Sequence, residues 1–146
     1  MSGNRPYLRH LLMRRYEWME ERVLEHAAKS GYSFVTPAMA RMFAHMGRKP
    51  IGISETAKRM AVSRQAIHQL AGEAANRGLI EIIDCESDRR LKLLRFTDKG
   101  WEMSAKAARG LASIEAELAR SIGEDDLNEL RRILSKAWPG DEERRS

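Results

Sequence analysis

The sequence predicts a mainly α-helical fold with one small β-hairpin. Three observations lead to this prediction. Apolar residues recur at spacings of three and four in long segments near both ends of the chain. Two shorter segments with the same periodicity, separated by a tight turn, lie between them. A run rich in β-branched residues, a polar loop and a second apolar run then follow. This order is that of a winged helix-turn-helix flanked by long terminal helices.

The first long helix is predicted within residues 6–30, and Gly31 follows it as a stop signal. Its apolar side chains recur along one face, so they form a continuous stripe. The residues of this stripe that we expect to mediate dimerisation are Leu8, Leu12, Tyr16, Met19 and Val23.

The central segment, residues 36–97, is predicted to hold the winged helix-turn-helix. Thr36 is expected to cap its first helix, with Pro37 at the first helical position. Ser63 is expected to cap the second helix of the helix-turn-helix, and Gly78 to end it. The predicted helices are 37–46, 53–60 and 64–77, and the predicted strands are 79–83 and 91–96.

Residues 98–138 are predicted to form the last two helices, which are separated by Gly123. The second of them carries another apolar stripe, composed of Leu127, Leu130, Ile133 and Leu134. A three-helix core cannot cover stripes from both ends of the chain. We therefore expect residues 1–146 to form a single domain that pairs with a second copy about a two-fold axis.

Composition and charge restrict the class of protein. Of the 146 residues, 42% are hydrophobic and 32% are charged, as in a globular domain, and the formal net charge of +5 favours a partner rich in phosphate. Cys85 is the only cysteine, so no intramolecular disulfide is expected. No apolar run approaches the roughly 20 residues that cross a bilayer. These features predict a cytoplasmic protein without a membrane partner.

The second helix of the helix-turn-helix carries the candidate base-reading residues. If Ile67, Leu70 and Ala74 face the core, the opposite face is polar. Gln side chains can pair with adenine, His can donate or accept, and an Arg at the rim suits a phosphate. The predicted contacts to double-stranded DNA in this region are Ser63, Arg64, Gln65, His68 and Gln69. The alternative reading is that this is only a solvated polar face.

The hairpin loop carries the second set of candidate residues, Asp88, Arg89 and Arg90. Arginines at the tip of a wing can enter the narrow and strongly negative minor groove beside a recognition site. A basic wing directly after a helix-turn-helix favours DNA binding over a merely solvated helix face.

The wing and its surroundings resemble the multiple-antibiotic-resistance regulator (MarR) family. The family's wing signature is an Asp, any residue, an Arg, three residues, an aliphatic residue, one residue, Leu-Thr, two residues and a Gly. Asp88, Arg90, Leu94, Thr97 and Gly100 fall at these spacings, and Phe96 stands where Leu is usual. The helix-turn-helix and the two long terminal helices also lie where the family has them, so the resemblance covers nearly the whole chain.

The resemblance implies more than the residues themselves show. It implies a homodimer with interlaced first and last helices, and a repressor that releases DNA on binding a small aromatic effector. It also implies that Arg90 enters the minor groove and that Asp88 holds it. A transcription activator of the same fold remains an alternative, because the sign of regulation depends on where the operator lies.

Other functions have weaker support in the sequence. His10, His26, His45 and His68 are scattered and form no paired ligand spacing, so no metal or other cofactor is predicted. There is no phosphate-binding glycine loop and no nucleophile motif, so an enzyme is not predicted. No flanking pattern marks Cys85 as a redox-active thiolate. A winged helix that binds another protein instead of DNA remains open as an alternative.

Overall fold

The computed structural model describes residues 5–144, and the chain divides into two compact units at Gly110 and Leu111. The boundary falls inside one long helix, α5, which spans Asp98–Ile122. The two units are described in turn. The outermost residues of the predicted 1–146 domain lie outside the described part of the chain.

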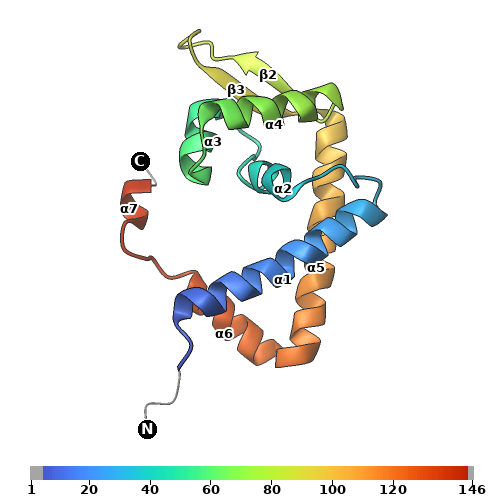
Figure 1. The fold of residues 1–146 in the computed structure, drawn as a ribbon, viewed down its shortest axis with the longest axis vertical. Helices are drawn as coiled ribbons and strands as arrows, with labels where there is room; N and C mark the ends of the chain where they lie inside the picture. Colours follow the sequence, from blue (N-terminus) through green and yellow to red (C-terminus); the bar gives the residue numbers. More distant parts are fainter. Residues whose placement is uncertain (1–4, 145–146) are drawn as a thin grey trace. The chain divides into compact units, whose positions relative to one another are not determined.

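The first unit contains the winged helix-turn-helix (Figure 1). Its helices before α5 are α1 (Leu8–Lys29), α2 (Pro37–Ala44), α3 (Ile53–Met60) and α4 (Arg64–Asn76). Its strands are β1 (Ile51–Gly52), β2 (Ile80–Asp84) and β3 (Lys92–Phe96). The predicted helix-turn-helix and hairpin are confirmed, with most bounds within one or two residues of those expected. The structure adds β1, which the sequence analysis did not predict.

The core of this unit lies between α2, α3, α4 and the sheet. Met42, Ile67, Leu79 and Leu94 are almost completely buried at its centre. Thr56 is the one fully buried polar residue among those described, and its hydroxyl donates a hydrogen bond of 2.9 Å to the Gly52 carbonyl. The buried Thr56 hydroxyl therefore has a hydrogen-bond acceptor within the core.

The three strands form an antiparallel sheet in the order β1-β3-β2. Leu94 in the central strand faces Ile82 on one side and Ile51 on the other. On the solvent face, Arg95 pairs with Glu81 across the strands at 2.6 Å. The loop at the tip of the β2–β3 hairpin extends beyond α4 in Figure 1, as a wing would.

The beginning of α5 is tied to the end of α4. Thr97 caps α5, because its side-chain oxygen accepts from the Gly100 N–H at 3.1 Å, and its hydroxyl donates to the Gly78 carbonyl at 2.5 Å. Lys99 adds a bond of 3.0 Å to the Arg77 carbonyl. A Cβ at Gly100 would lie 1.9 Å from the Leu79 carbonyl oxygen. The glycine of the wing signature is therefore needed for this close approach.

The second unit consists of the rest of α5, α6 (Glu124–Leu134) and the short α7 (Asp141–Arg144). Arg131 of α6 bonds to Glu115 of α5 at 2.7 Å. Helix α6 ends three residues after Arg131, short of the predicted limit at 138, and the Ser135 hydroxyl donates to the Arg131 carbonyl at this end.

Candidate nucleic-acid interface

Helix α4 is held in place by one fully buried face. Ile67, Ala71 and Ala74 are all 0% exposed, and they recur at helical spacing. Ala57 of α3 is also buried. The small side chains of Ala57, Ala71 and Ala74 allow the two helices to pack closely, so the opposite face of α4 is directed away from the core.

The turn before α4 sets where the helix begins. Ala61 adopts the left-handed conformation, with φ of 54°, at the end of α3. Arg41 of α2 donates a bond of 3.3 Å to the carbonyl of Met60 just before it. The Ser63 hydroxyl oxygen then accepts from the Ala66 N–H at 3.0 Å, which confirms the predicted cap. Ser63 is exposed, so its hydroxyl is also accessible from solvent.

The predicted base-reading residues lie together on the exposed side of the first two turns of α4. Arg64, Gln65, His68 and Gln69 are all exposed. None of their side chains has a hydrogen bond or ion pair with another residue in the range 5–144. Their donors and acceptors are therefore directed to solvent, where base edges and phosphates could bind them.

The tip of the wing is a compact turn closed by its own backbone. The Leu91 N–H donates to the Asp88 carbonyl at 3.0 Å, and the Cys85 N–H donates to the Leu91 carbonyl at 3.1 Å. Below the tip, Lys92 pairs with Asp84 across the two strands. These contacts place Arg89 and Arg90 on the exposed end of the hairpin.

Asp88 holds Arg90 by three hydrogen bonds. The Arg90 Nε and backbone N–H each lie 3.1 Å from Asp88 Oδ1, and Arg90 Nη2 lies 3.4 Å from Oδ2. The Arg90 side chain is 90% exposed, whereas that of Asp88 is 33% exposed. The Arg90 guanidinium, followed by the Arg90 backbone N–H, lowers the pKa of Asp88 below its ordinary value. The carboxylate is thus ionised at neutral pH and orients an arginine that is otherwise in solvent.

Cys85 lies at the base of this tip, and its thiol has a lowered pKa that the sequence analysis did not predict. Its Sγ lies 3.2 Å from the Ser87 hydroxyl, and this hydrogen bond, followed by those from the backbone of Asp88 and Ser87, lowers the pKa of the thiol. No sequence pattern predicts this lowered pKa, because the contact depends on the shape of the loop.

The predicted dimerisation stripes remain uncovered in the single chain. None of the residues of α1 or α6 is fully buried. The large apolar side chains of these stripes that are classed as exposed are Leu8, Tyr16, Leu130, Ile133 and Leu134. The others, Leu12, Met19, Val23 and Leu127, are half-buried.

Comparison with solved structures decides the fold family. The transcriptional repressor CouR bound to a 23-mer DNA duplex is 26% identical to this chain, with 88% of this chain and 90% of that chain covered and a TM-score of 0.73. MarR from E. coli in its apo form is 17% identical, with coverages of 94% and 100% and a TM-score of 0.78. The chain has the MarR-family fold.

Two further results complete the comparison. The YusO protein from Bacillus subtilis shares this arrangement at 25% identity and a TM-score of 0.63, over 88% of this chain and 89% of that chain. No family model matches the sequence, and a search of curated proteins also finds no match. The MarR-type neighbours are transcription regulators and not enzymes. Within residues 5–144, no helix is both long enough and apolar enough to cross a bilayer.

Sequence reasoning missed the contacts that join the MarR-type elements. Residues 51–52 form β1 only because they pair with Leu93 and Leu94, far along the chain. The bonds from Thr97 and Lys99 to the end of α4 were likewise unforeseen. The glycine of the wing signature, Gly100, was the only sequence feature that pointed to these contacts. The structure shows why a glycine is needed there, because Gly100 lies against the Leu79 backbone.

Proposed function

We propose that this protein is a sequence-specific DNA-binding transcription regulator that acts as a homodimeric repressor in the cytoplasm. The observation that carries the proposal is the exposed polar face at the start of α4, whose side chains have no partner in the described chain. It lies on a helix-turn-helix whose hairpin presents two exposed arginines. Such a pair of elements suits simultaneous contact with the major and minor grooves.

The residues proposed to contact DNA are those expected from the sequence: Ser63, Arg64, Gln65, His68, Gln69, Asp88, Arg89 and Arg90. Gln65 and His68 would read base edges in the major groove, and Arg64 would bind phosphate. Arg90 would enter the minor groove with Asp88 as its support. The structure of CouR, a repressor bound to a DNA duplex, supports this assignment at the level of the fold and the partner.

Footprinting tests the proposal most directly. The protein is incubated with the promoter region beside its own gene, and protected bases are mapped. A two-fold dimer should protect an imperfect inverted repeat with half-sites about 10 base pairs apart, or a multiple of this spacing. A random duplex of equal length is the control. Equal affinity for both duplexes, or a single asymmetric half-site, would contradict the proposed mode of binding.

The homodimer is proposed from the uncovered stripes of α1 and α6. Isolated exposed apolar residues are common, but rows of them along one helix face indicate an interface. Segments 6–30 and 98–138 would supply the dimer contacts and segment 36–97 the DNA contacts. Light scattering should give the mass of two chains, and thermal unfolding should shift to higher temperature with protein concentration. A stable monomer at micromolar concentration would exclude this assembly.

The most detailed part of the proposal is that a small aromatic effector releases the protein from DNA. CouR from Rhodococcus jostii RHA1, 21% identical to this chain, has been solved with p-coumaroyl-CoA bound. An effector of this protein would act by favouring a dimer state whose recognition helices no longer match the spacing of the groove.

A further inference from the structure

The exposed face of α4 continues beyond the residues proposed to contact DNA. Residues spaced four, three and four apart share one face of a helix, and those along the middle of this face are Gln65, Gln69, Gly72 and Asn76. Gln65 and Gln69 belong to the proposed DNA contacts, whereas Gly72 and Asn76 do not. The Asn76 side chain is exposed and has no hydrogen bond or ion pair with another residue in the range 5–144.

Gly72 lowers the stability of α4 without a reason in the fold. A glycine inside a helix destabilises it relative to alanine, because glycine loses more conformational freedom when the chain folds. Gly72 lies in the middle of α4, and its φ is outside the left-handed region that favours glycine. A Cβ at this position would meet nothing within 4 Å. Neither the backbone conformation nor packing within the described chain therefore requires a glycine here.

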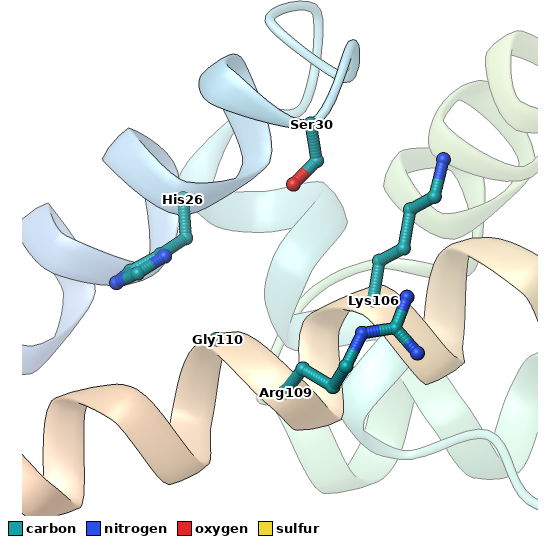
Figure 2. A pocket seen from close by; sticks show the side chains of 5 residues that line it. All are labelled: His26, Ser30, Lys106, Arg109 and Gly110. Carbon is teal, nitrogen blue, oxygen red and sulfur yellow. The ribbon is translucent and has the colours of Figure 1, made fainter.

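The glycines of α5 show what such a requirement looks like. A Cβ at Gly100 would lie 1.9 Å from the Leu79 carbonyl oxygen. Figure 2 shows Gly110 on α5 and His26 on α1, and a Cβ at Gly110 would lie 3.2 Å from His26 Cβ. Each of these glycines lets a second segment of the chain come close. Gly72 lacks such a neighbour in the chain, and a glycine on a binding surface allows the same close approach by a ligand.

The dimensions of the helix and of the groove indicate which part of the DNA approaches. An α-helix rises 1.5 Å per residue, so Gly72 lies about 10 Å along α4 from Gln65. The major groove is about 12 Å wide, and a recognition helix enters it with its N-terminal end. A helix whose first two turns reach base edges therefore passes the sugar–phosphate strand near Gly72. The Asn76 amide, one turn further on, can donate to a phosphate oxygen of that strand.

The charged side chains beside Gly72 do not block this approach. Glu73, the only acidic residue of α4, lies about 100° round the helix from Gly72. It lines a hollow of about 290 Å³ at the end of α4, together with Phe34, Asn76 and Arg77. The Arg77 guanidinium lies 3.7 Å above the Phe34 ring, so the hollow contains one charge of each sign. A phosphate beside Asn76 is therefore not repelled by an isolated carboxylate.

We propose that one sugar–phosphate strand of the operator lies directly against α4 at Gly72, and that Asn76 donates to a phosphate of this strand. This inference rests on the proposed function, because it extends the same DNA-binding surface. The missing side chain lets α4 enter the groove deeply enough for Gln65 and His68 to reach base edges. A glycine that destabilises the isolated protein thus strengthens its complex with DNA.

Substitutions of increasing size at Gly72 test the close approach. Fluorescence titrations compare operator and random duplexes. Gly72→Ala should weaken binding to both about fivefold, and Gly72→Leu about fiftyfold or more, because a larger side chain overpacks the contact further. Both new residues are better helix formers than glycine, so the unfolding temperature should not fall. Gly47→Ala, whose Cβ also meets nothing within 4 Å, makes the same change in the loop before β1 and should leave DNA affinity unchanged.

Each other result of this series contradicts the proposal. Equal losses in Gly72→Ala and Gly72→Leu would show that a stiffer helix, and not added bulk, weakens binding. Unchanged affinity in both variants would show that no strand lies against α4 at this position. A loss confined to the operator would place a base edge there instead. Failure of the native protein to bind either duplex would overturn the proposed function as well.

Two substitutions at Asn76 test the phosphate contact. Asn76→Ala should weaken binding to operator and random DNA about threefold, because one hydrogen bond is lost. Asn76→Asp has nearly the same shape and should weaken binding more, and its extra loss should shrink at high salt. Asn128→Asp makes the same change of net charge on α6 and should alter the affinity little. If Asn76→Asp binds DNA as tightly as Asn128→Asp, no phosphate lies beside Asn76 and this contact is overturned.

Discussion

The recognition helix and the wing are held in place by different kinds of contact. Helix α4 is fixed by a fully buried face and by the bonds that join its end to Thr97 and Lys99. The tip of the wing has no buried side chain of its own, and its order comes from hydrogen bonds within residues 85–91. One element is therefore positioned by the core and the other by its own turn.

This difference suits the two proposed tasks. Reading base edges requires donors and acceptors held within a fraction of an ångström, which a packed helix provides. An arginine in the minor groove responds to width and negative potential, for which an exposed and locally oriented side chain is sufficient. The predictions below test whether the two elements differ in function as they differ in support.

The largest effect is expected at Gly100, where the start of α5 closely approaches the backbone that follows α4. Gly100→Ala should lower the free energy of unfolding by about 3 kcal/mol or more, because the new Cβ would overlap the Leu79 backbone, which cannot rotate away. Gly72→Ala is the matched control, since its Cβ would meet nothing within 4 Å. That change should stabilise the helix by about 0.5–1 kcal/mol. Chemical denaturation of both variants at one protein concentration measures the difference, and equal stabilities would contradict the close approach.

The next largest effect is expected on the reading face of α4. Gln65→Ala or His68→Ala should cost about 1–3 kcal/mol in binding to the cognate operator and much less on random DNA. Both side chains are exposed and have no partner in the described chain, so neither change should alter folding. Fluorescence titrations with operator and random duplexes provide the comparison. Similar losses on the two duplexes would mean that these residues bind only the backbone.

The wing arginine is expected to have a smaller and less selective effect. Arg90→Ala should weaken binding to operator and random DNA to a similar extent, about tenfold. The slope of log affinity against log salt should fall by about 1, because one counterion-releasing contact is lost. Titrations at several salt concentrations measure both quantities. A loss confined to the operator would show that the wing reads sequence, and the division of tasks between wing and helix would be wrong.

The same division explains how far the sequence could predict the structure. The Ser63 cap and the buried face of α4 depend on residues within a few positions of each other, and both were predicted correctly. The pairing of Ile51 with Leu94 and the approach of α1 to α5 at Gly110 join distant segments. No local pattern encodes such contacts, because they depend on how whole elements pack.

The proposed DNA contacts of α4 and those of the wing also differ in how far the sequence predicts them. The outward direction of Gln65 and His68 followed from helical periodicity alone. The pairing of Asp88 with Arg90 was expected only from the resemblance to MarR proteins, and the structure shows its geometry.

The smallest effect is expected at Asp88, the support of the wing arginine. Because the pKa of this carboxyl is lowered in the folded chain, its contribution is present above the ordinary value and lost only as pH falls through the lowered one. DNA binding between pH 6 and 8 should therefore not vary on account of Asp88.

Asp88→Asn produces at neutral pH the uncharged side chain that acid would otherwise create. It keeps an oxygen that can accept from the Arg90 N–H but removes the charge that orients the guanidinium. Its affinity for operator and random DNA should fall equally, by less than in Arg90→Ala. The double variant should be no weaker than Arg90→Ala alone, since Asp88 would act only through that arginine. Additive losses in the double variant would show instead that Asp88 contacts DNA or supports the turn independently.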